Sequence, residues 1–225
     1  MTDETISKLT ARATELHFAE NLPAEICGFA TEKIFAAVDD KFFFFACADD
    51  ELHCALKTYF HEETNEFKIS QRIGLTEFCL TKFFTEDFSA FQKLIDAELE
   101  HALKNLRDVH NDKLNRFLRE KGIDAWTYGR ELPATLEGFE LFISPSAPVE
   151  VTNGSFILVN YVDFAAGSDF VLYYNVYGDV FSVESRIKGD TQVGYAFEST
   201  TLDELTDKLK QNLSAELKTI RRLSQ

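Results

Sequence analysis

The sequence predicts an α+β protein built by tandem duplication of a helix–antiparallel sheet–helix unit, giving two pseudo-symmetric repeats. Three observations predict this class. The octapeptide LPAEICGF at 22–29 returns as LPATLEGF at 132–139, with five of eight residues identical. A constant shift of 114 aligns 42–106 with 156–220 without a gap and yields ten identical pairs. In each half, short apolar segments typical of strands lie between segments with the apolar periodicity of amphipathic helices.

These matches divide the chain into repeat one, 1–110, and repeat two, 111–225, joined by the linker RDVHNDK at 107–113. Ten identities are few, but the apolar positions of the two halves also coincide. The alternative is that two similar amphipathic layouts align by chance. The sequence pattern is compatible with one sheet shared by both repeats and with a separate sheet in each.

Repeat one is expected to begin with a helix, because apolar residues recur at spacings of three and four, and to break at Pro23. Five strands with short turns should then pair as antiparallel neighbours. The expected elements are a helix at 3–19, strands at 26–34, 41–48, 52–61, 66–73 and 77–84, and a helix at 88–107.

Repeat two is expected to follow the same layout. Asn111 or Asp112 should cap its first helix and Gly122 should end it. Gly178-Asp179 is typical of a hairpin turn, and Thr201 with Glu204 forms a capping box. The expected elements are a helix at 114–121, strands at 139–144, 156–163, 169–177, 179–187 and 193–198, and a final helix.

Four consecutive phenylalanines, Phe42 to Phe45, are unusual in an acidic chain. Such an apolar run between polar turns is typical of a strand that is buried on both faces. Alternation predicts that Phe42 and Phe44 point to one face and Phe43 and Phe45 to the other. We expect the rings to form the core and the packing between repeats. A groove for a partner is the alternative.

The net charge of −15, from 23 basic and 38 acidic residues, disfavours nucleic acid and anionic membranes and favours a basic partner. The alternative is that the acids serve solubility alone. No basic region followed by an apolar one opens the sequence, and no apolar run approaches the length of a membrane span. Four irregularly spaced cysteines indicate reduced thiols. A cytoplasmic location is therefore expected.

No phosphate-binding, hydrolase or zinc motif occurs in the sequence, so we expect no metal and no cofactor and lean away from an enzyme. All four cysteines and all five histidines lie in 1–110. His53 and His61 flank one strand and would lie about 26 Å apart, too far to share an ion. A two-residue turn would place Cys47 opposite Cys54, as two buried thiols or as a redox pair.

Three polar residues recur in both repeats: Tyr59 with Tyr173, Arg72 with Arg186, and Asp49 with Asp163. We interpret them as a structural triad in each repeat, in which the arginine pairs with the shared aspartate. A catalytic triad is the alternative.

Acidic residues are concentrated where basic ones are missing, because 131–185 contains eight acids and neither Lys nor Arg. A negative surface would attract a basic partner, although acids that merely face solvent would give the same pattern. The candidate binding residues are Asp49, Asp50, Glu51, Glu150, Asp163, Asp169 and Asp179.

The first functional hypothesis is therefore a non-enzymatic, cytoplasmic protein-binding module that engages a basic protein, such as an immunity or chaperone-like protein. The second is a small-molecule-binding protein or enzyme with a Phe-lined pocket in repeat one, near His53, Cys54 and Tyr59. The third is a structural subunit that forms a homodimer through an apolar sheet face.

Overall fold

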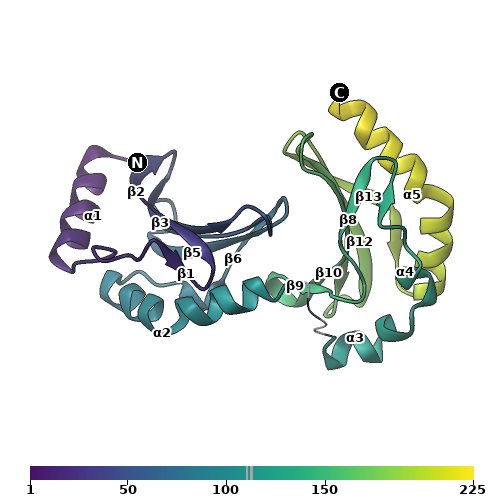
Figure 1. Ribbon diagram of the computed structural model, residues 1–225, viewed down its shortest axis with the longest axis horizontal. Coiled ribbons are helices and arrows are strands. Elements are labelled where there is room, and N and C mark those ends of the chain that lie inside the picture. Colours follow the sequence, from purple (N-terminus) through teal and green to yellow (C-terminus); the bar gives the residue numbers. More distant parts are fainter. Residues whose placement is uncertain (110, 112–113) are drawn as a thin grey trace. The chain divides into compact units, whose positions relative to one another are not determined.

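The structure is a computed structural model that describes residues 1–109, 111 and 114–225, apart from the side chain of Asn153. The chain divides into two compact units, Met1–Asp108 and Val109–Gln225. Together the described residues form five α-helices and two antiparallel sheets, an α+β fold (Figure 1). None of the described helices combines the length and the apolar character that crossing a bilayer requires.

Unit 1 consists of a six-stranded sheet in sequential order, preceded by one helix and followed by another. Every connection in the sheet is a hairpin, as expected for strands joined by short turns. Its elements are α1 (Asp3–Glu15), β1 (Glu25–Ile26), β2 (Phe29–Val38), β3 (Lys41–Asp49), β4 (Cys54–His61), β5 (Glu66–Ile73), β6 (Thr76–Cys79), a 3₁₀ turn (Thr81–Phe83) and α2 (Phe88–Arg107).

Unit 2 has a seven-stranded sheet in the order β13-β12-β11-β10-β8-β7, with β9 also paired to β10. Its elements are α3 (Arg116–Glu120), a 3₁₀ turn (Ile123–Ala125), α4 (Thr127–Arg130), β7 (Thr135–Leu136), β8 (Phe139–Ile143), β9 (Val149–Glu150), a 3₁₀ turn (Thr152–Gly154), β10 (Ser155–Asp163), β11 (Ser168–Asn175), β12 (Val180–Ile187), β13 (Asp190–Ser199) and α5 (Leu202–Ser224).

Side-chain caps fix where the long helices begin. Asp87 accepts a hydrogen bond from the Ala90 N–H at the start of α2, and Thr201 accepts one from the Glu204 N–H at the start of α5. These caps satisfy amide groups that have no partner within the helix. The predicted cap at Thr201 is thereby confirmed.

Two helix boundaries differ from the predictions. The first helix ends at Glu15 rather than at residue 19, because His17 and Ala19 adopt left-handed φ angles of 52° and 57°. The first helix of unit 2 begins after Asn115, whose side chain accepts the Leu118 N–H. Asn115, not Asn111, is therefore its cap, and Asp112 lies outside the described residues.

The two sheets share the same pairing register at positions 114 residues apart. Phe42 lies opposite Phe60, as Phe156 lies opposite Tyr174. A bulge follows Phe43 in β3 and Ile157, its equivalent, in β10. The likeness extends through the pairs β4–β5 and β11–β12 and the pairs β5–β6 and β12–β13.

The aromatic core of unit 1 is centred on Phe44, which is fully buried. Its ring lies 5.4 Å from that of Phe18 and 5.5 Å from that of Phe88 on α2. The bulge changes the predicted alternation, because Phe45 also contacts Phe18 and thus faces the same side as Phe44. Phe43 lies on the other face, where its ring packs 5.6 Å from that of Tyr59. The bulge is therefore why strict alternation was wrong.

In unit 2, α5 lies against one face of the sheet (Figure 1), and its apolar stripe forms the core with the inward residues of the strands. The final helix is confirmed, and five residues of its apolar face are buried: Leu205, Leu209, Leu213, Leu217 and Ile220. Trp126, the single tryptophan of the chain, is also buried in this core and donates its indole N–H to Thr206 of α5 at 2.8 Å.

An arginine in the last turns of each long helix reaches back to the first hairpin of the same unit. Arg107 Nη1 donates to the Cys27 carbonyl at 3.1 Å, and Arg221 Nη1 donates to the Glu137 carbonyl at 2.6 Å. The next residue in each case is a glycine, Gly28 or Gly138, with φ near +88°. A side chain there would collide with the guanidinium, so the glycine admits the arginine. We call each contact an arginine latch.

Candidate functional site

Asp49 and Asp163, both predicted to bind a partner, form the hairpin turns that follow β3 and β10. Asp49 Oδ1 accepts the Leu52 N–H at 3.0 Å, and Asp163 Oδ1 accepts the Ala166 N–H at 3.0 Å. Such a side chain closes a turn by replacing a backbone acceptor. Both carboxylates therefore already accept a hydrogen bond from the backbone of their own turn.

Asp169 is a correction to the predicted surface, because its side chain is fully buried and cannot meet a partner. The strand register places it directly opposite Arg186 on β12. Arg186 Nη1 donates to Asp169 Oδ2 at 2.9 Å, and Asn160 Nδ2 donates to the same oxygen at 3.3 Å. Burial raises the pKa of Asp169 to about 6, against the opposing effect of Arg186.

The same register corrects the predicted triad. Arg186 pairs with Asp169, not with the turn residue Asp163, and Arg72 donates to the Gly74 carbonyl at 3.4 Å. On β4 the residue opposite Arg72 is Ala55, so unit 1 has no carboxylate at the position of Asp169. On the other side of Arg72, β6 places Glu77 opposite it.

Asp179 is exposed, but its carboxylate already contacts other side chains of unit 2. It forms an ion pair with Lys121 and accepts a hydrogen bond from the Tyr174 hydroxyl at 2.9 Å. Both contacts lower its pKa, the Lys121 contact most. Of the predicted set, Asp50, Glu51 and Glu150 remain as exposed carboxylates on turns or short strands.

A cavity of about 520 Å³ lies in unit 1, between the segment that joins α1 to β2 and one face of α2. This volume is within the range of small-molecule sites. Phe45 of β3 and Phe18 contribute buried aromatic rings. The lining residues are His17, Phe18, Ala19, Glu20, Asn21, Leu22, Pro23, Glu25, Ile26, Cys27, Phe45, Gln92, Ile95, Asp96, Leu99 and Glu100.

The cavity is acidic, since its lining includes four carboxylates and neither Lys nor Arg. Two of them have partners: Glu20 contacts His17 at 2.6 Å, and Glu100 contacts Lys104 at 3.1 Å. The carboxylates of Glu25 and Asp96 are exposed and have no side-chain partner among the described residues. Arg107 and Lys33 donate to the carbonyls of the lining residues Cys27 and Glu20, so basic groups lie at the edge of the cavity. The carboxylates of Glu25 and Asp96 remain unpaired within the described part of the chain, in a cavity that Phe18 and Phe45 also line. We call this site the acidic pocket.

The residues predicted for a pocket in repeat one lie elsewhere. His53, Cys54 and Tyr59 are absent from the lining of the acidic pocket. Tyr59 is buried and its hydroxyl lies 3.1 Å from Cys79 Sγ. Burial, the largest effect, raises the pKa of Tyr59. A pocket lined by phenylalanine was predicted in repeat one, and the acidic pocket has such a lining. Its position differs from the predicted one.

The cysteines are free thiols. Cys54 lies opposite Asp49, and Cys47 lies opposite Leu56, because the hairpin loop has four residues instead of the predicted two. Burial raises the pKa of Cys47 and of Cys54 to about 12. Both therefore remain protonated, unreactive core residues at neutral pH.

Sequence reasoning missed the acidic pocket because its walls come from segments that are distant in the chain. One signal was present: Asp96 and Glu100 are four residues apart and so share a helix face with the apolar Leu99 nearby. Whether such a face is covered depends on the loop ahead of β1, which no local pattern specifies.

Comparison with known proteins returned no matching family model, no similar curated protein and no similar solved structure.

Proposed function

We propose that the protein is a non-enzymatic module that binds a basic protein partner, and that the acidic pocket receives a lysine or arginine side chain of that partner. The observation that carries this proposal is the pairing of two free carboxylates, Glu25 and Asp96, with the rings of Phe18 and Phe45 in one cavity. A cytoplasmic location belongs to the proposal and is supported by the free thiols.

The chemistry of the pocket matches a long cationic side chain. The apolar stem of lysine or arginine packs on hydrophobic surface while its charged end stays among polar groups. Here the stem would lie against the aromatic rings, where a cation also gains from the π face, by about 0.5–2 kcal/mol. The charged end would pair with Glu25 or Asp96. The chain's charge of −15 would speed the encounter.

We further propose that the two units arose by tandem duplication, which is supported by their common register, bulge and arginine latch. At the shift of 114, Asp96 corresponds to Lys210 on α5. Lys210 Nζ lies 5.4 Å from the ring centre of Tyr128. In unit 2 the chain thus supplies its own cation over an aromatic ring, whereas in unit 1 that position carries an acid.

The exposed acids Asp50, Glu51 and Glu150 would add long-range attraction without close contacts. Surface charges of this kind contribute mainly to association rate and are screened by salt. An immunity or chaperone-like role fits such a module.

The test is binding of a fluorescent peptide in which arginine alternates with leucine, compared with the same peptide carrying citrulline. Citrulline keeps the shape and removes the charge. We expect Glu25→Lys/Asp96→Lys to weaken binding of the arginine peptide at least about tenfold, equivalent to 1.4 kcal/mol. Asp50→Lys/Glu51→Lys makes the same charge change outside the pocket and should weaken binding less. Equal loss in both variants, or equal binding of both peptides, contradicts the pocket.

A second candidate is a small-molecule-binding protein or enzyme, favoured by the cavity volume of about 520 Å³. Its ligand would be an amphipathic organic cation held by the same carboxylates. Thermal shift assays with aromatic amines and guanidines separate the two cases. A free cation that saturates the pocket and displaces the peptide supports the small-molecule role, whereas peptide binding alone supports the protein partner.

A further inference from the structure

Three potential metal ligands meet at one end of the unit 1 sheet, away from the residues that line the acidic pocket. Asp40 lies in the turn between β2 and β3, His61 ends β4, and Glu63 lies in the following turn. The two turns are adjacent because Lys41 pairs with His61 across the strands. The Glu62 N–H also donates to the Asp40 carbonyl at 2.8 Å.

The geometry of the three side chains suits a single ion. One ligand atom from each lies within 4.8 Å of the others, and His61 Nε2 is 2.7 Å from Asp40 Oδ2. Two atoms bound at about 2.1 Å to the same ion are separated by roughly 2.7–4.2 Å. Glu63 is exposed, so a change of its rotamer can bring its carboxylate within that range.

A separate network fixes the histidine ring. His61 Nδ1 lies 2.9 Å from Thr64 Oγ1, and Lys68 Nζ donates to the same oxygen at 2.8 Å. Thr64 therefore lies on the Nδ1 side of the His61 ring. This leaves Nε2 as the nitrogen that faces Asp40.

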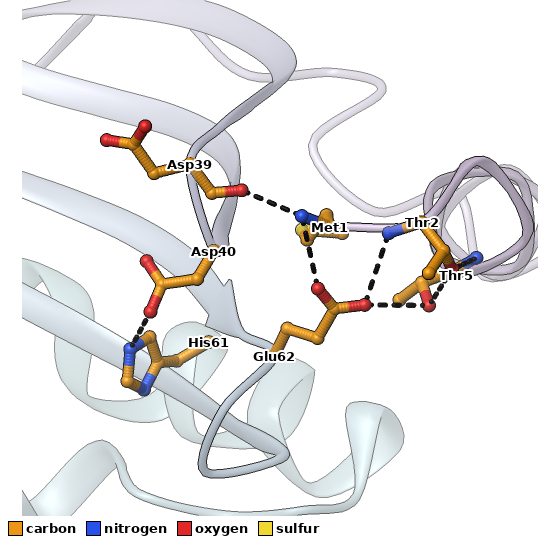
Figure 2. Close-up of polar contacts among 7 residues, drawn as sticks. All are labelled: Met1, Thr2, Thr5, Asp39, Asp40, His61 and Glu62. Atoms are coloured by element: carbon orange, nitrogen blue, oxygen red, sulfur yellow. Dashed lines mark hydrogen bonds and ion pairs between the residues drawn. The ribbon is translucent and has the colours of Figure 1, made fainter.

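His61 Nε2 and Asp40 Oδ2 lie 2.7 Å apart, a contact that either a proton between the two atoms or a metal ion bound by both would stabilise. A ligand histidine whose other nitrogen donates to a second residue is the usual arrangement in metal sites. The neighbouring Glu62 is engaged otherwise, since it contacts the Met1 nitrogen at 3.1 Å and accepts from Thr5. Figure 2 shows His61 directed at Asp40, and Glu62 turned toward the N-terminal segment.

We propose that Asp40, His61 and Glu63 form a binding site for a divalent transition-metal ion such as Zn²⁺, with water completing its coordination. One imidazole and two carboxylates are ligand types that such ions accept. The two carboxylate charges balance the ion when the imidazole is neutral. Two lysines lie near the site and are engaged elsewhere. The Lys41 ammonium lies over the Tyr59 ring at 5.4 Å from the centre, and Lys68 forms an ion pair with Glu66 at 2.8 Å.

The test is calorimetric titration of chelator-treated protein with ZnCl₂. A Cys27→Ser/Cys79→Ser background removes the two thiols that are not fully buried and could bind zinc themselves. We expect saturable binding of one ion per chain. His61→Gln and Glu63→Gln should each weaken it at least about tenfold, as changes around a metal ligand do.

His101→Gln is the matched control, because His101 is an exposed histidine on α2 of the same unit, and it should leave the affinity unchanged. Glu63 is exposed and its replacement should not disturb folding, so the proposal stays testable if His61→Gln unfolds. Absence of saturable binding overturns the site. So does binding that survives Glu63→Gln and His61→Gln at full affinity.

Discussion

Replacing Asp169 with asparagine should remove one pH-dependent contribution to the stability of unit 2. Asp169 is buried beside Arg186, and its Oδ1 has no hydrogen-bond partner among the described residues. Glu184 on the same strand as Arg186 adds a further, repulsive effect. The folded protein therefore holds the Asp169 proton more tightly than the unfolded chain does.

The pKa of Asp169 rises from 3.8 to about 6 on folding. Between these values the folded state binds the proton and the unfolded state does not, so stability falls as pH rises. At 1.36 kcal/mol per pH unit, the whole effect is on the order of 3 kcal/mol. From pH 7.5 to pH 5, the wild type should gain about 1.4 kcal/mol relative to Asp169→Asn.

Trp126 makes this measurable, since the single tryptophan is buried in unit 2 and its fluorescence reports unfolding there. Urea unfolding of both proteins at pH 5, 6 and 7.5 gives the difference in free energy at each pH. Titrating groups that both proteins share and that do not interact with Asp169 cancel in this difference. A difference that does not change with pH would refute the reasoning. Glu150→Gln, which removes an exposed carboxylate, is the matched control and should leave the profile unchanged.

Three further predictions concern the packing of each unit. Gly138→Ala should destabilise unit 2 more than Gly167→Ala does. Both glycines have positive φ, but only a Cβ at 138 would collide with a neighbour, at 1.8 Å from Arg221 Nη1. Urea unfolding followed by Trp126 fluorescence compares the two variants, and equal losses of unfolding free energy would argue against the latch. Thr201→Ala should cost about 1 kcal/mol by removing the cap of α5. Thr219→Ala in the same helix removes only a side-chain hydrogen bond to a carbonyl that the helix already pairs, and it should cost less. Phe44→Ala should lower the stability of unit 1 by about 3–5 kcal/mol because it leaves a cavity in the core. The urea dependence of cysteine reactivity measures this loss. A loss of stability below about 1 kcal/mol would contradict the central position of this ring.

The parts of the fold that were predicted correctly are those that local chemistry specifies. The strand at 66–73, the cap at Thr201 and the hairpin around Gly178-Asp179 follow from alternation, capping and turn residues. Gly122 also ends its helix in the left-handed conformation, as predicted. Bulges were not predicted, because an extra residue at Phe44 leaves the apolar pattern of the strand unchanged.

The candidate site was harder to predict, because exposure and partners depend on register. Asp169 and Asp179 look alike in the sequence, yet one is buried against Arg186 and the other is exposed beside Lys121. The acidic pocket joins residues of the 17–27 segment to α2, and their meeting depends on how the helix docks. Counting charges in the sequence therefore predicts a negative surface and does not locate the acidic pocket.

The arginine latches also bear on the order in which each unit folds. They join residues that are 80 and 84 positions apart in the chain, so closing either loop costs conformational entropy before any hydrogen bond repays it. The sheet hairpins need only short loops and can form first. Each latch then closes only on a unit whose first hairpin and last helix are both in place. It stabilises the completed topology and gives nothing to partly folded chains.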